Sequence, residues 1–354
     1  MSKQHKLAVV IGRFQPFHNQ HAELIKKATT LADNVIVLVG GADKPRTPKN
    51  PFTVEERREM INQWSYSNPA PEGWGHAEFT GGLDVVGIRD YMYSDQTWAE
   101  NVQRVVKEPM FDGHSGFEDN DIIVVGCNKD ESSFYLKMFP QWALHEEPYT
   151  EHIDATQIRE LLYDDRSLDF LRSAVPDNVL TFLKEFKAGD VFTGIVQERN
   201  VVAKYRKAWE AAPYAPTFVT TDAVVIQSGH ILLVTRGGQP GRGLLALPGG
   251  FLEQNERVID GVIRELREET KIKVAAPILR GSIRETAVFD APGRSSRGRT
   301  ITHASLILLP DGPLPKVKGS DDAMKAAWYP LGSLKSENFF EDHHDIIEYF
   351  KGRV

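Results

Sequence analysis

Cysteine is nearly absent from this sequence: Cys127 is the one example among 354 residues. A single cysteine excludes an intrachain disulfide and a zinc site built from several cysteines. Long apolar runs are also absent. The run at 7–11 is too short for a signal-peptide core, and no 18-residue apolar stretch is available to cross a membrane. We therefore expect a cytoplasmic protein with no membrane partner.

Positive charge is not in excess either. The 42 Lys and Arg residues are outnumbered by 49 Asp and Glu, which gives a formal net charge of −7. Binding to nucleic acid relies on a basic field that this balance does not supply. We expect no nucleic-acid partner, although local basic pockets for small phosphates remain compatible with the composition. Homo-oligomerisation is left open.

The first half of the chain alternates short β-branched runs with amphipathic stretches. Apolar runs at 7–11, 35–39 and 122–125 suit strands buried on both faces of a parallel sheet. Helical patterns occupy 21–31, 53–64 and 95–106, and two or three more helices are expected over 154–187. This alternation predicts an α/β fold, a doubly wound Rossmann-like domain over residues 1–187.

The second half has a different character. Strands are expected at 219–226 and 231–234, joined by a Ser228-Gly229 hairpin signal. A helix over 255–270, strands at 281–288, 301–309 and 324–329, and a helix over 342–350 follow. This order predicts a mixed α+β sandwich over 217–354. Gly and Pro breaks mark 188–216 as a linker, with a helix expected at 201–212.

A run of special residues follows the first predicted strand: Gly12-Arg13-Phe14-Gln15-Pro16-Phe17-His18-Asn19-Gln20-His21. Glycine allows a sharp turn where the strand ends. The two histidines are three positions apart, so they share one face where the next helix opens. Free N–H groups at a helix start attract anions. Arginine and two imidazoles beside them favour a polyphosphate.

A matching element lies far downstream. Asp154 is suited to cap a helix in which Thr156 and Arg159 lie one turn apart on one face. A guanidinium offers a planar fork of donors to phosphate oxygens. The downstream element therefore favours phosphate binding as well.

Together the two elements resemble the nucleotidylyltransferase superfamily, which carries H-x-x-H after the first strand and a late S/T-x-x-R. The resemblance is to the archaeal-type nicotinamide mononucleotide adenylyltransferases in particular, over residues 6–187. Two departures stand out. Gln20 replaces the usual glycine before the second histidine, and Asp154-Ala155 replaces two serines.

That resemblance implies transfer of AMP from ATP to nicotinamide mononucleotide (NMN), giving NAD and pyrophosphate. His18 and His21 would contact the α-phosphate, Arg13 and Arg159 would hold the β- and γ-phosphates, and Mg²⁺ or Mn²⁺ would screen the charge. Trp98 is open to two interpretations, a stack on the nicotinamide ring or a core side chain. The residues expected to bind nucleotide are Gly12, Arg13, Phe14, Trp98, Thr156 and Arg159.

An acidic helix face marks the second half. Glu265, Glu268 and Glu269 fall within one sector of ~100° on the helix expected there. Apolar side chains fill the neighbouring sector, so one side packs and the other presents carboxylates. Three close carboxylates repel one another unless a cation lies among them. Their hard oxygen atoms suit Mg²⁺ or Mn²⁺.

This face resembles the Nudix box. Gly250 is followed at the family's spacing by Glu256 and then by the run Arg-Glu-Leu-Arg-Glu-Glu-Thr-Lys-Ile at 264–272. Lys271 stands where the family has glycine, a backbone position whose left-handed conformation costs a lysine about 1 kcal/mol. The resemblance implies that Gly250, Glu265, Glu268 and Glu269 hold the metal, that Arg264 orients the glutamates, and that ADP-ribose is hydrolysed to AMP and ribose 5-phosphate.

Several points stay open at the level of sequence. The general base is either a glutamate of the box or one of Glu285, Asp290, Asp321 and Asp322. The arginine-rich loop 294–299 either receives substrate or is simply solvated. Preference between nicotinamide and nicotinate mononucleotide is not determined. The second half could instead hydrolyse NADH or a dinucleoside polyphosphate, or serve as a metabolite-binding regulatory module.

The whole arrangement resembles the bifunctional proteins that join an archaeal-type NMN adenylyltransferase to a Nudix hydrolase. The expected fold is α/β, with an N-terminal Rossmann-like nucleotidylyltransferase domain and a C-terminal α+β Nudix sandwich. The small molecules that the resemblance implies as partners are ATP, nicotinamide mononucleotide, NAD and ADP-ribose.

Overall fold

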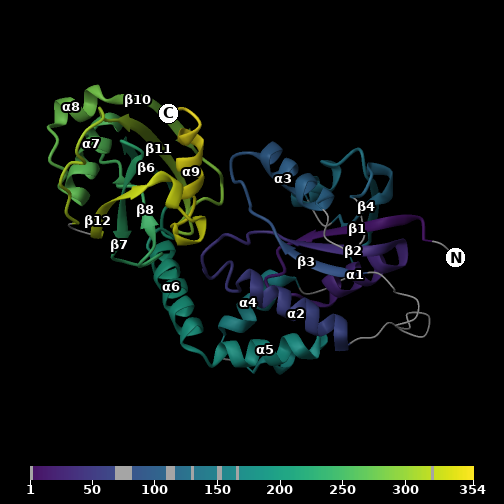
Figure 1. The fold of residues 1–354 in the computed structure, drawn as a ribbon. Coiled ribbons are helices and arrows are strands. Elements are labelled where there is room, and N and C mark those ends of the chain that lie inside the picture. Colours follow the sequence, from purple (N-terminus) through teal and green to yellow (C-terminus); the bar gives the residue numbers. More distant parts are fainter. Residues whose placement is uncertain are drawn as a thin grey trace. The chain divides into compact units, whose positions relative to one another are not determined.

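The computed structural model describes residues 3–67, 82–108, 116–128, 131–149, 154–164, 167–319 and 323–354. The chain divides into two compact units, Met1–Val196 and Gln197–Val354 (Figure 1). Within the described ranges, the structure contains no helix with the length and apolar character that a membrane span requires.

The first unit is built on a five-stranded sheet in which every neighbouring pair is parallel, in the order β3-β2-β1-β4-β5. The strand order reverses beside β1, which is where ligands bind at the carboxyl ends of strands in open α/β sheets. The strands are β1 His5–Gly12, β2 Ala32–Val39, β3 Leu83–Gly87, β4 Ile122–Cys127 and β5 Ala143–Glu147.

Helices cover both faces of this sheet (Figure 1). Ala8 and Val10 of β1 belong to one core cluster, and Leu7 and Val9 belong to another. Buried side chains of α1, α2, α4 and α5 pack in the first cluster, and those of α3 pack in the second. The helices are α1 Asn19–Leu31, α2 Val54–Ser67, α3 Asp95–Lys107, α4 Ala155–Tyr163 and α5 Asp177–Lys187, with 3-10 turns at Asp119–Asp121, Glu131–Lys137 and Leu168–Ser173.

The second unit has a mixed sheet in the order β10-β11-β6-β7-β12, with β8 beside β7 and β9 beside β6. β11 runs parallel to β6, and the other pairs are antiparallel. The strands are β6 Thr217–Gln227, β7 His230–Arg236, β8 Leu245–Ala246, β9 Gly249–Phe251, β10 Ile283–Phe289, β11 Arg299–Leu308 and β12 Ala323–Pro330.

Two helices lie on opposite sides of this second sheet (Figure 1). Helix α7, Val258–Thr270, buries Val262, Ile263 and Leu266 in a core cluster with β6 and β7. Helix α9, His343–Lys351, buries Phe350, whose ring centroid lies 6.0 Å from that of Phe289 on β10. A short helix, α8 at Ala276–Gly281, and 3-10 turns at Leu331–Ser333 and Ser336–Asn338 complete the unit.

These elements confirm the expected fold class. A capping box opens α2, because Thr53 N donates to Glu56 Oε2 at 2.8 Å and Glu56 N donates to Thr53 Oγ1 at 3.3 Å. The hairpin signal is confirmed by left-handed backbone at Ser228 and Gly229. The edge strands β3 and β5 were missed because neither carries a continuous apolar run.

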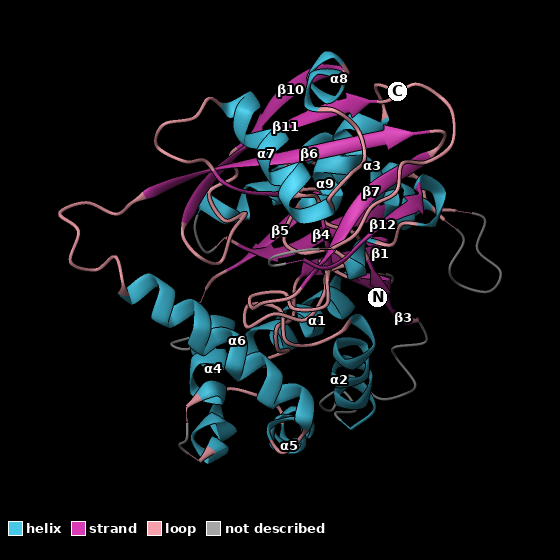
Figure 2. Ribbon diagram, turned by 90° about the vertical axis from the view of Figure 1, so that its left-hand side faces the viewer, coloured by secondary structure: helices cyan, strands magenta, loops and turns pink. Residues whose placement is uncertain are grey.

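The helix expected at 201–212 was placed wrongly. Helix α6 spans Asp190–Lys207, and Figure 2 shows it as one continuous helix. Helix α5 ends at Lys187, and the next helix begins at Asp190, directly after Gly189. The predicted start was too late because the first apolar residues of α6, Phe192 and Ile195, are buried in the first unit's core. The chain divides within α6, inside the segment predicted as a linker.

Removal of these two side chains is predicted to weaken the first unit. The Phe192 ring lies 6.0 Å from Tyr163 and 6.1 Å from Phe186. Deleting a buried Phe side chain costs about 3–5 kcal/mol. A fragment of residues 1–187 should therefore unfold at lower urea concentration than a fragment of residues 1–196. Unfolding of both fragments is monitored by circular dichroism. Equal unfolding midpoints for the two fragments would contradict this packing.

Candidate functional sites

The loop after β1 takes up the turn that its sequence demands. Phe14 has a φ of 50°, and its ring lies so close to Gly12 that a Cβ there would stand 3.0 Å from Phe14 Cζ. Gln15 fixes the loop to a second segment, because its side chain donates to Phe52 O at 2.8 Å and accepts from Phe52 N at 3.0 Å. Gly12, the last residue of β1, thus makes room for the Phe14 ring, a different reason for glycine from the sharp turn that we expected.

A buried arginine, which the sequence gave no separate role, supports this edge of the sheet. Arg57 Nη1 donates to the carbonyl oxygens of Arg13 at 2.8 Å and Gly40 at 2.7 Å, and Nη2 donates to Gly41 O at 3.2 Å. Burial lowers the pKa of Arg57 to about 10, which leaves the guanidinium charged at neutral pH. Arg57 therefore ties the ends of β1 and β2 together.

The two histidines of the motif are stacked. His18 is the residue before α1, and its ring centroid lies 3.7 Å from that of His21. His18 N donates to His21 Nδ1 at 3.3 Å. Burial, and next the charge of His18, lower the pKa of His21 well below its usual value. A neutral His21 that accepts at Nδ1 carries its proton on Nε2, which is then a donor.

Cations gather beside these rings. Arg159 Nη1 donates to Gln15 O at 2.6 Å, and its Nη2 donates to Thr156 Oγ1 at 3.1 Å, so α4 is joined to the loop after β1. Arg13 pairs with Asp90 at 3.1 Å. Burial lowers the pKa of Lys49, and the charges of Arg13 and Arg159 lower it further.

The structure therefore brings the early and late motif elements together at one edge of the sheet. Lys49 and Asp90 were not among the predicted site residues. Their signal in the sequence was only their place in segments that follow β2 and β3.

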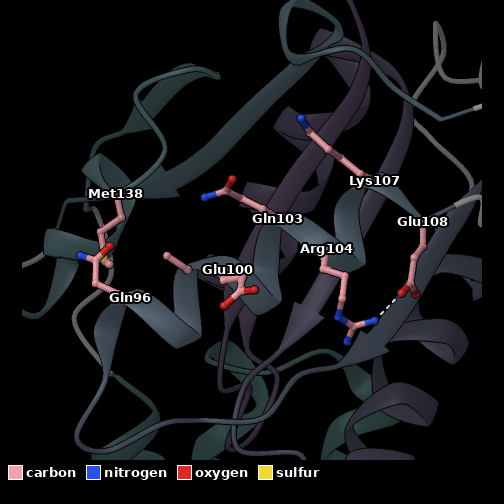
Figure 3. A pocket seen from close by; sticks show the side chains of 8 residues that line it. Gln96, Glu100, Gln103, Arg104, Lys107, Glu108 and Met138 are labelled. Carbon is pink, nitrogen blue, oxygen red and sulfur yellow. Dashed lines mark hydrogen bonds and ion pairs between the residues drawn. The ribbon is translucent and has the colours of Figure 1, made fainter.

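The other sequence expectations for this unit have mixed outcomes. Asp154 caps α4, since its Oδ1 accepts from Gln157 N at 2.9 Å. Trp98 packs in the core cluster on the other face of the sheet, with its ring centroid 6.0 Å from Tyr135 and 5.9 Å from Phe139. A cavity of about 640 Å³ follows the outer side of α3 (Figure 3), and none of the predicted site residues lines it.

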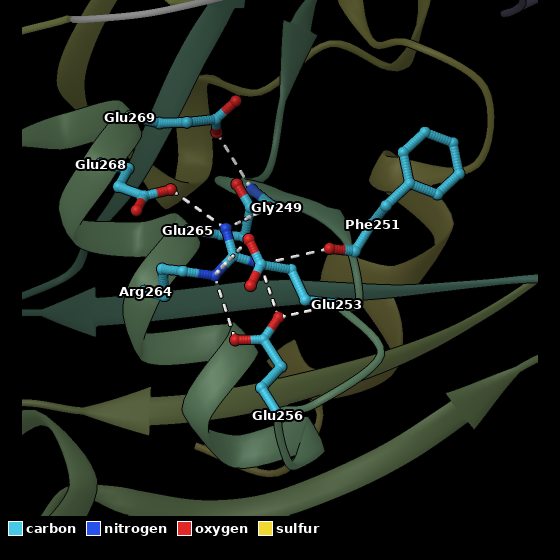
Figure 4. A network of polar contacts seen from close by, with 8 residues as sticks. All are labelled: Gly249, Phe251, Glu253, Glu256, Arg264, Glu265, Glu268 and Glu269. Atoms are coloured by element: carbon cyan, nitrogen blue, oxygen red, sulfur yellow. Dashed lines mark hydrogen bonds and ion pairs between the residues drawn. The ribbon is translucent and has the colours of Figure 1, made fainter.

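The acidic face of α7 is organised around one arginine (Figure 4). Arg264 donates to both carboxylate oxygens of Glu256, at 3.0 and 2.6 Å. Its Nη1 also donates to Glu265 at 2.9 Å and to Glu268 at 3.0 Å. Its Nη2 reaches the carbonyl oxygen of Phe251 at 3.2 Å. The guanidinium fork joins three carboxylates to strand β9.

Glu269 stands apart from the arginine and is more deeply buried. Burial raises the pKa of Glu269 to about 8, and the nearby charges of Glu265 and Asp222 act in the same direction. One hydrogen bond, from Gly249 N at 3.0 Å, favours its charged form. Burial also raises the pKa of Glu265. For Glu265 the effect of burial outweighs the opposing charge of Arg264, which lowers the pKa.

Two glycines allow β9 to approach these carboxylates. A Cβ on Gly249 would lie 2.2 Å from Thr221 O, and one on Gly250 would lie 2.5 Å from Glu265 Oε1. Backbone contact this close is available only to glycine. The predicted members of the second site, Gly250, Arg264, Glu265, Glu268 and Glu269, are thus brought together, and Glu256 and Gly249 join them.

The fit to a divalent cation rests on this donor set. Carboxylate oxygens and a backbone carbonyl are the ligands that Mg²⁺ and Mn²⁺ prefer. Burial first, and neighbouring carboxylates second, raise the pKa values of Glu265 and Glu269, and a bound cation would favour their charged forms. As the side chains stand, no three His, Cys, Asp or Glu residues of the described ranges form a metal cage. Two of the three carboxylates, those of Glu265 and Glu268, accept hydrogen bonds from the Arg264 guanidinium instead.

The departure from the box pattern is accommodated at the end of α7. Lys271 follows the helix with φ 46° and ψ 31°, the left-handed conformation that the family's glycine would adopt. Lys271 N donates to Arg267 O at 3.0 Å, so the helix ends in the ordinary way.

The general base remains a prediction. Glu285 on β10 accepts from Tyr349 Oη at 3.1 Å and pairs with Arg353 at 3.2 Å. Asp290 pairs with Arg299. Glu269, one of the box glutamates, accepts a hydrogen bond from Gly249 N at 3.0 Å. Asp321 and Asp322 lie outside the described residues.

The loop 294–299 divides its arginines between two roles. Arg294 forms a buried two-point ion pair with Asp342 at 2.8 Å, so this side chain is structural and does not receive substrate. Arg297 lies against the exposed ring of Phe251, 5.3 Å from its centroid and next to Gly250.

Two family models match the chain. The cytidylyltransferase-like model matches residues 9–161, and the NUDIX domain model matches residues 216–350. The fold and the two sites therefore define a nucleotidyltransferase-type unit followed by a Nudix unit.

Similar proteins unite these two classes in one chain. The crystal structure of a bifunctional NMN adenylyltransferase/ADP ribose pyrophosphatase from Francisella tularensis, complexed with AMP and a manganese ion, is 33% identical, covers 99% of both chains and has a TM-score of 0.86. This chain belongs to that bifunctional family.

Single-activity relatives match the separate units. A nicotinamide/nicotinic acid mononucleotide adenylyltransferase of Acinetobacter baylyi is 35% identical over 54% of this chain and 91% of its own length. An ADP-ribose pyrophosphatase of Methanocaldococcus jannaschii is 33% identical over 44% of this chain and 80% of its own length.

The second unit should lose stability as pH falls below about 6.5. His343 Nδ1 accepts from Leu247 N at 3.0 Å, and burial lowers the pKa of His343 to about 4. The unfolded chain binds a proton near pH 6.5, where the folded unit does not. This contribution is therefore present above pH 6.5 and is lost as pH falls toward 4.

The control is His343→Gln, which keeps an acceptor but does not titrate. Urea unfolding is monitored by pulsed hydrogen exchange of peptides from β6 and β7. The free energy of unfolding should be higher for the wild type than for the variant at pH 7, and this difference should shrink by pH 5. A constant difference between the two proteins would contradict a neutral, buried His343.

Proposed function

We propose that this chain catalyses two reactions of NAD metabolism. The first unit transfers AMP from ATP to nicotinamide mononucleotide, which yields NAD and pyrophosphate. The second unit hydrolyses ADP-ribose to AMP and ribose 5-phosphate. The observation that carries the first activity is the meeting of His18, His21 and Arg159 at the end of β1. The glutamates around Arg264 carry the second.

In the first unit the chain positions two anions and stabilises the charge that develops between them. The 5′-phosphate of the mononucleotide is ionised at neutral pH, so it attacks the α-phosphorus without a strong base. His18 and His21 lie beside that phosphorus, where His21 Nε2–H donates to an oxygen that gains charge. Arg13, Arg159 and Lys49 hold the departing β- and γ-phosphates.

The two units would hold a metal ion in different ways. The cations Arg13, Lys49 and Arg159 gather at the triphosphate site, where Asp90 pairs with Arg13, so this set of side chains suits a metal ion that arrives with ATP. In the second unit the protein itself supplies the ligands, Gly250 O, Glu265, Glu268 and Glu269. A divalent cation held there polarises the diphosphate and lowers the pKa of the attacking water.

The residues of the second unit have distinct tasks beyond holding the cation. Arg264 keeps Glu265 and Glu268 in place through the fork that it shares with Glu256. Gly249 N–H orients Glu269 through a hydrogen bond of 3.0 Å.

The first activity should depend on His18 and Arg159. Replacement of either by Ala should lower NAD formation by about two orders of magnitude or more, the scale of losing one preorganised charge contact. Arg159→Lys should recover little, because an ammonium lacks the fork that reaches Thr156 and Gln15. The exposed Arg172→Ala is a matched control. Near-normal NAD formation by the His18 and Arg159 variants would overturn the assignment.

The second activity should fail separately. Glu268→Gln keeps the size of the side chain but removes one charge from the proposed metal ligands, so hydrolysis of ADP-ribose should fall together with Mg²⁺ affinity. NAD formation by the same protein should stay within a factor of about two, since the first site uses different residues in a separate unit. Exposed Glu337→Gln is the control. Undiminished hydrolysis would contradict the ligand role, and a circular dichroism melt identifies an unfolded variant.

A further inference from the structure

A second charged feature lies on the outer side of α7. A groove of about 540 Å³ runs along the C-terminal half of the helix, with Ile263 and Ile272 among its lining residues. Five cationic side chains line it. Arg264 belongs to the acidic site described above, and the other four are Arg267, Lys271, Lys273 and Arg280.

Two further lysines come from the segment that precedes β12. Lys273 N donates to Lys316 O at 3.2 Å, and Lys318 N donates to Thr270 O at 2.8 Å. These backbone bonds place the segment directly beside the groove. Five basic residues thus line the groove and two more lie in the neighbouring segment, on a chain whose net charge is −7.

The carboxylates that line the groove are already occupied. Among the described lining residues they are Asp260, which pairs with Arg280, and Glu268, which pairs with Arg264 at 3.0 Å. The exposed side chains of Arg267 and Lys273 therefore add positive charge that these two carboxylates do not balance.

Lys271 strengthens this interpretation through its backbone. It holds the left-handed conformation at φ 46°, which glycine adopts without cost and lysine at about 1 kcal/mol. Its side chain lines the groove. Lys271, the one departure from the box pattern, therefore adds its positive charge to this groove.

We propose that this groove binds a small phosphoanion that carries at least two phosphoryl groups. Arginine forks and lysine ammoniums are the donors that recognise phosphate oxygens. The groove volume of about 540 Å³ has room for pyrophosphate or for the triphosphate of a nucleotide. A long polyanion would also meet the negative charge of the rest of the chain. One source, pyrophosphate released by adenylyl transfer, rests on the proposed function of the first unit.

The test is a titration of the full chain with inorganic pyrophosphate by calorimetry, in buffer with EDTA. The background variant Arg159→Ala weakens pyrophosphate binding at the first site, and all groove variants are compared in this background, so any remaining binding at the first site is the same in each. We expect one binding event whose affinity falls about tenfold or more in Arg267→Gln/Lys273→Gln. The control Arg257→Gln/Lys335→Gln removes the same charges from exposed positions elsewhere on the unit, and it should bind within about twofold of the background.

Parallel titrations separate the sources of the anion. ATP bound with the same sensitivity to the groove variant means that the groove accepts nucleotide polyphosphates as well as pyrophosphate. Equal binding by the groove variant and the background would overturn the proposal, as would equal loss in both double variants. Binding of single-stranded RNA without binding of either small anion would also overturn it. Because neither activity is assayed, failure here is distinct from failure of the proposed function.

Discussion

Crowding of like charges is the constraint on which both sites depend. The first unit gathers Arg13, Lys49 and Arg159 at one edge of its sheet, and the second gathers Glu265, Glu268 and Glu269 along one helix. Side chains of one sign repel one another, most strongly where burial removes water. Each group is held in place by a counter-charge from the chain, Asp90 in the first unit and Arg264 in the second.

These counter-charges explain how the sites are formed before a substrate arrives. Asp90 holds Arg13 until, in our account, a triphosphate offers the guanidinium a stronger partner. Arg264 holds two glutamates through a fork that is itself fixed by Glu256 and Phe251 O. The remaining glutamate, Glu269, accepts a hydrogen bond from a backbone N–H, and burial raises its pKa to about 8. The surrounding backbone is equally specific, because Gly249 and Gly250 admit no side chain.

Much of this could be predicted from the sequence. Continuous apolar runs identified β1, β2 and β4, because central parallel strands are buried on both faces. The spacing of Glu265, Glu268 and Glu269 placed them on one helix face. The edge strands β3 and β5 and the start of α6 could not be read in this way. An edge strand has no continuous apolar signature, and the buried residues of α6 complete a core whose other members lie far away in sequence.

The contacts that support the two sites could not be predicted from local sequence patterns either. Nothing local shows that Arg57 is buried beneath the carbonyls of Arg13 and Gly40, or that Arg294 pairs with Asp342 rather than facing a substrate. Such roles depend on chain segments that the fold brings together. Lys49 and Asp90 were missed for the same reason, since each lies on a different loop from the motifs.

The central claim is that one chain carries two separate phosphate chemistries. The most direct measurement is ³¹P NMR of the purified full chain with Mg²⁺, first with ATP and nicotinamide mononucleotide and then, in a second sample, with ADP-ribose. The account predicts NAD and pyrophosphate in the first sample, and AMP and ribose 5-phosphate in the second. A sample in which NAD does not form, or in which ADP-ribose persists unchanged, would contradict it.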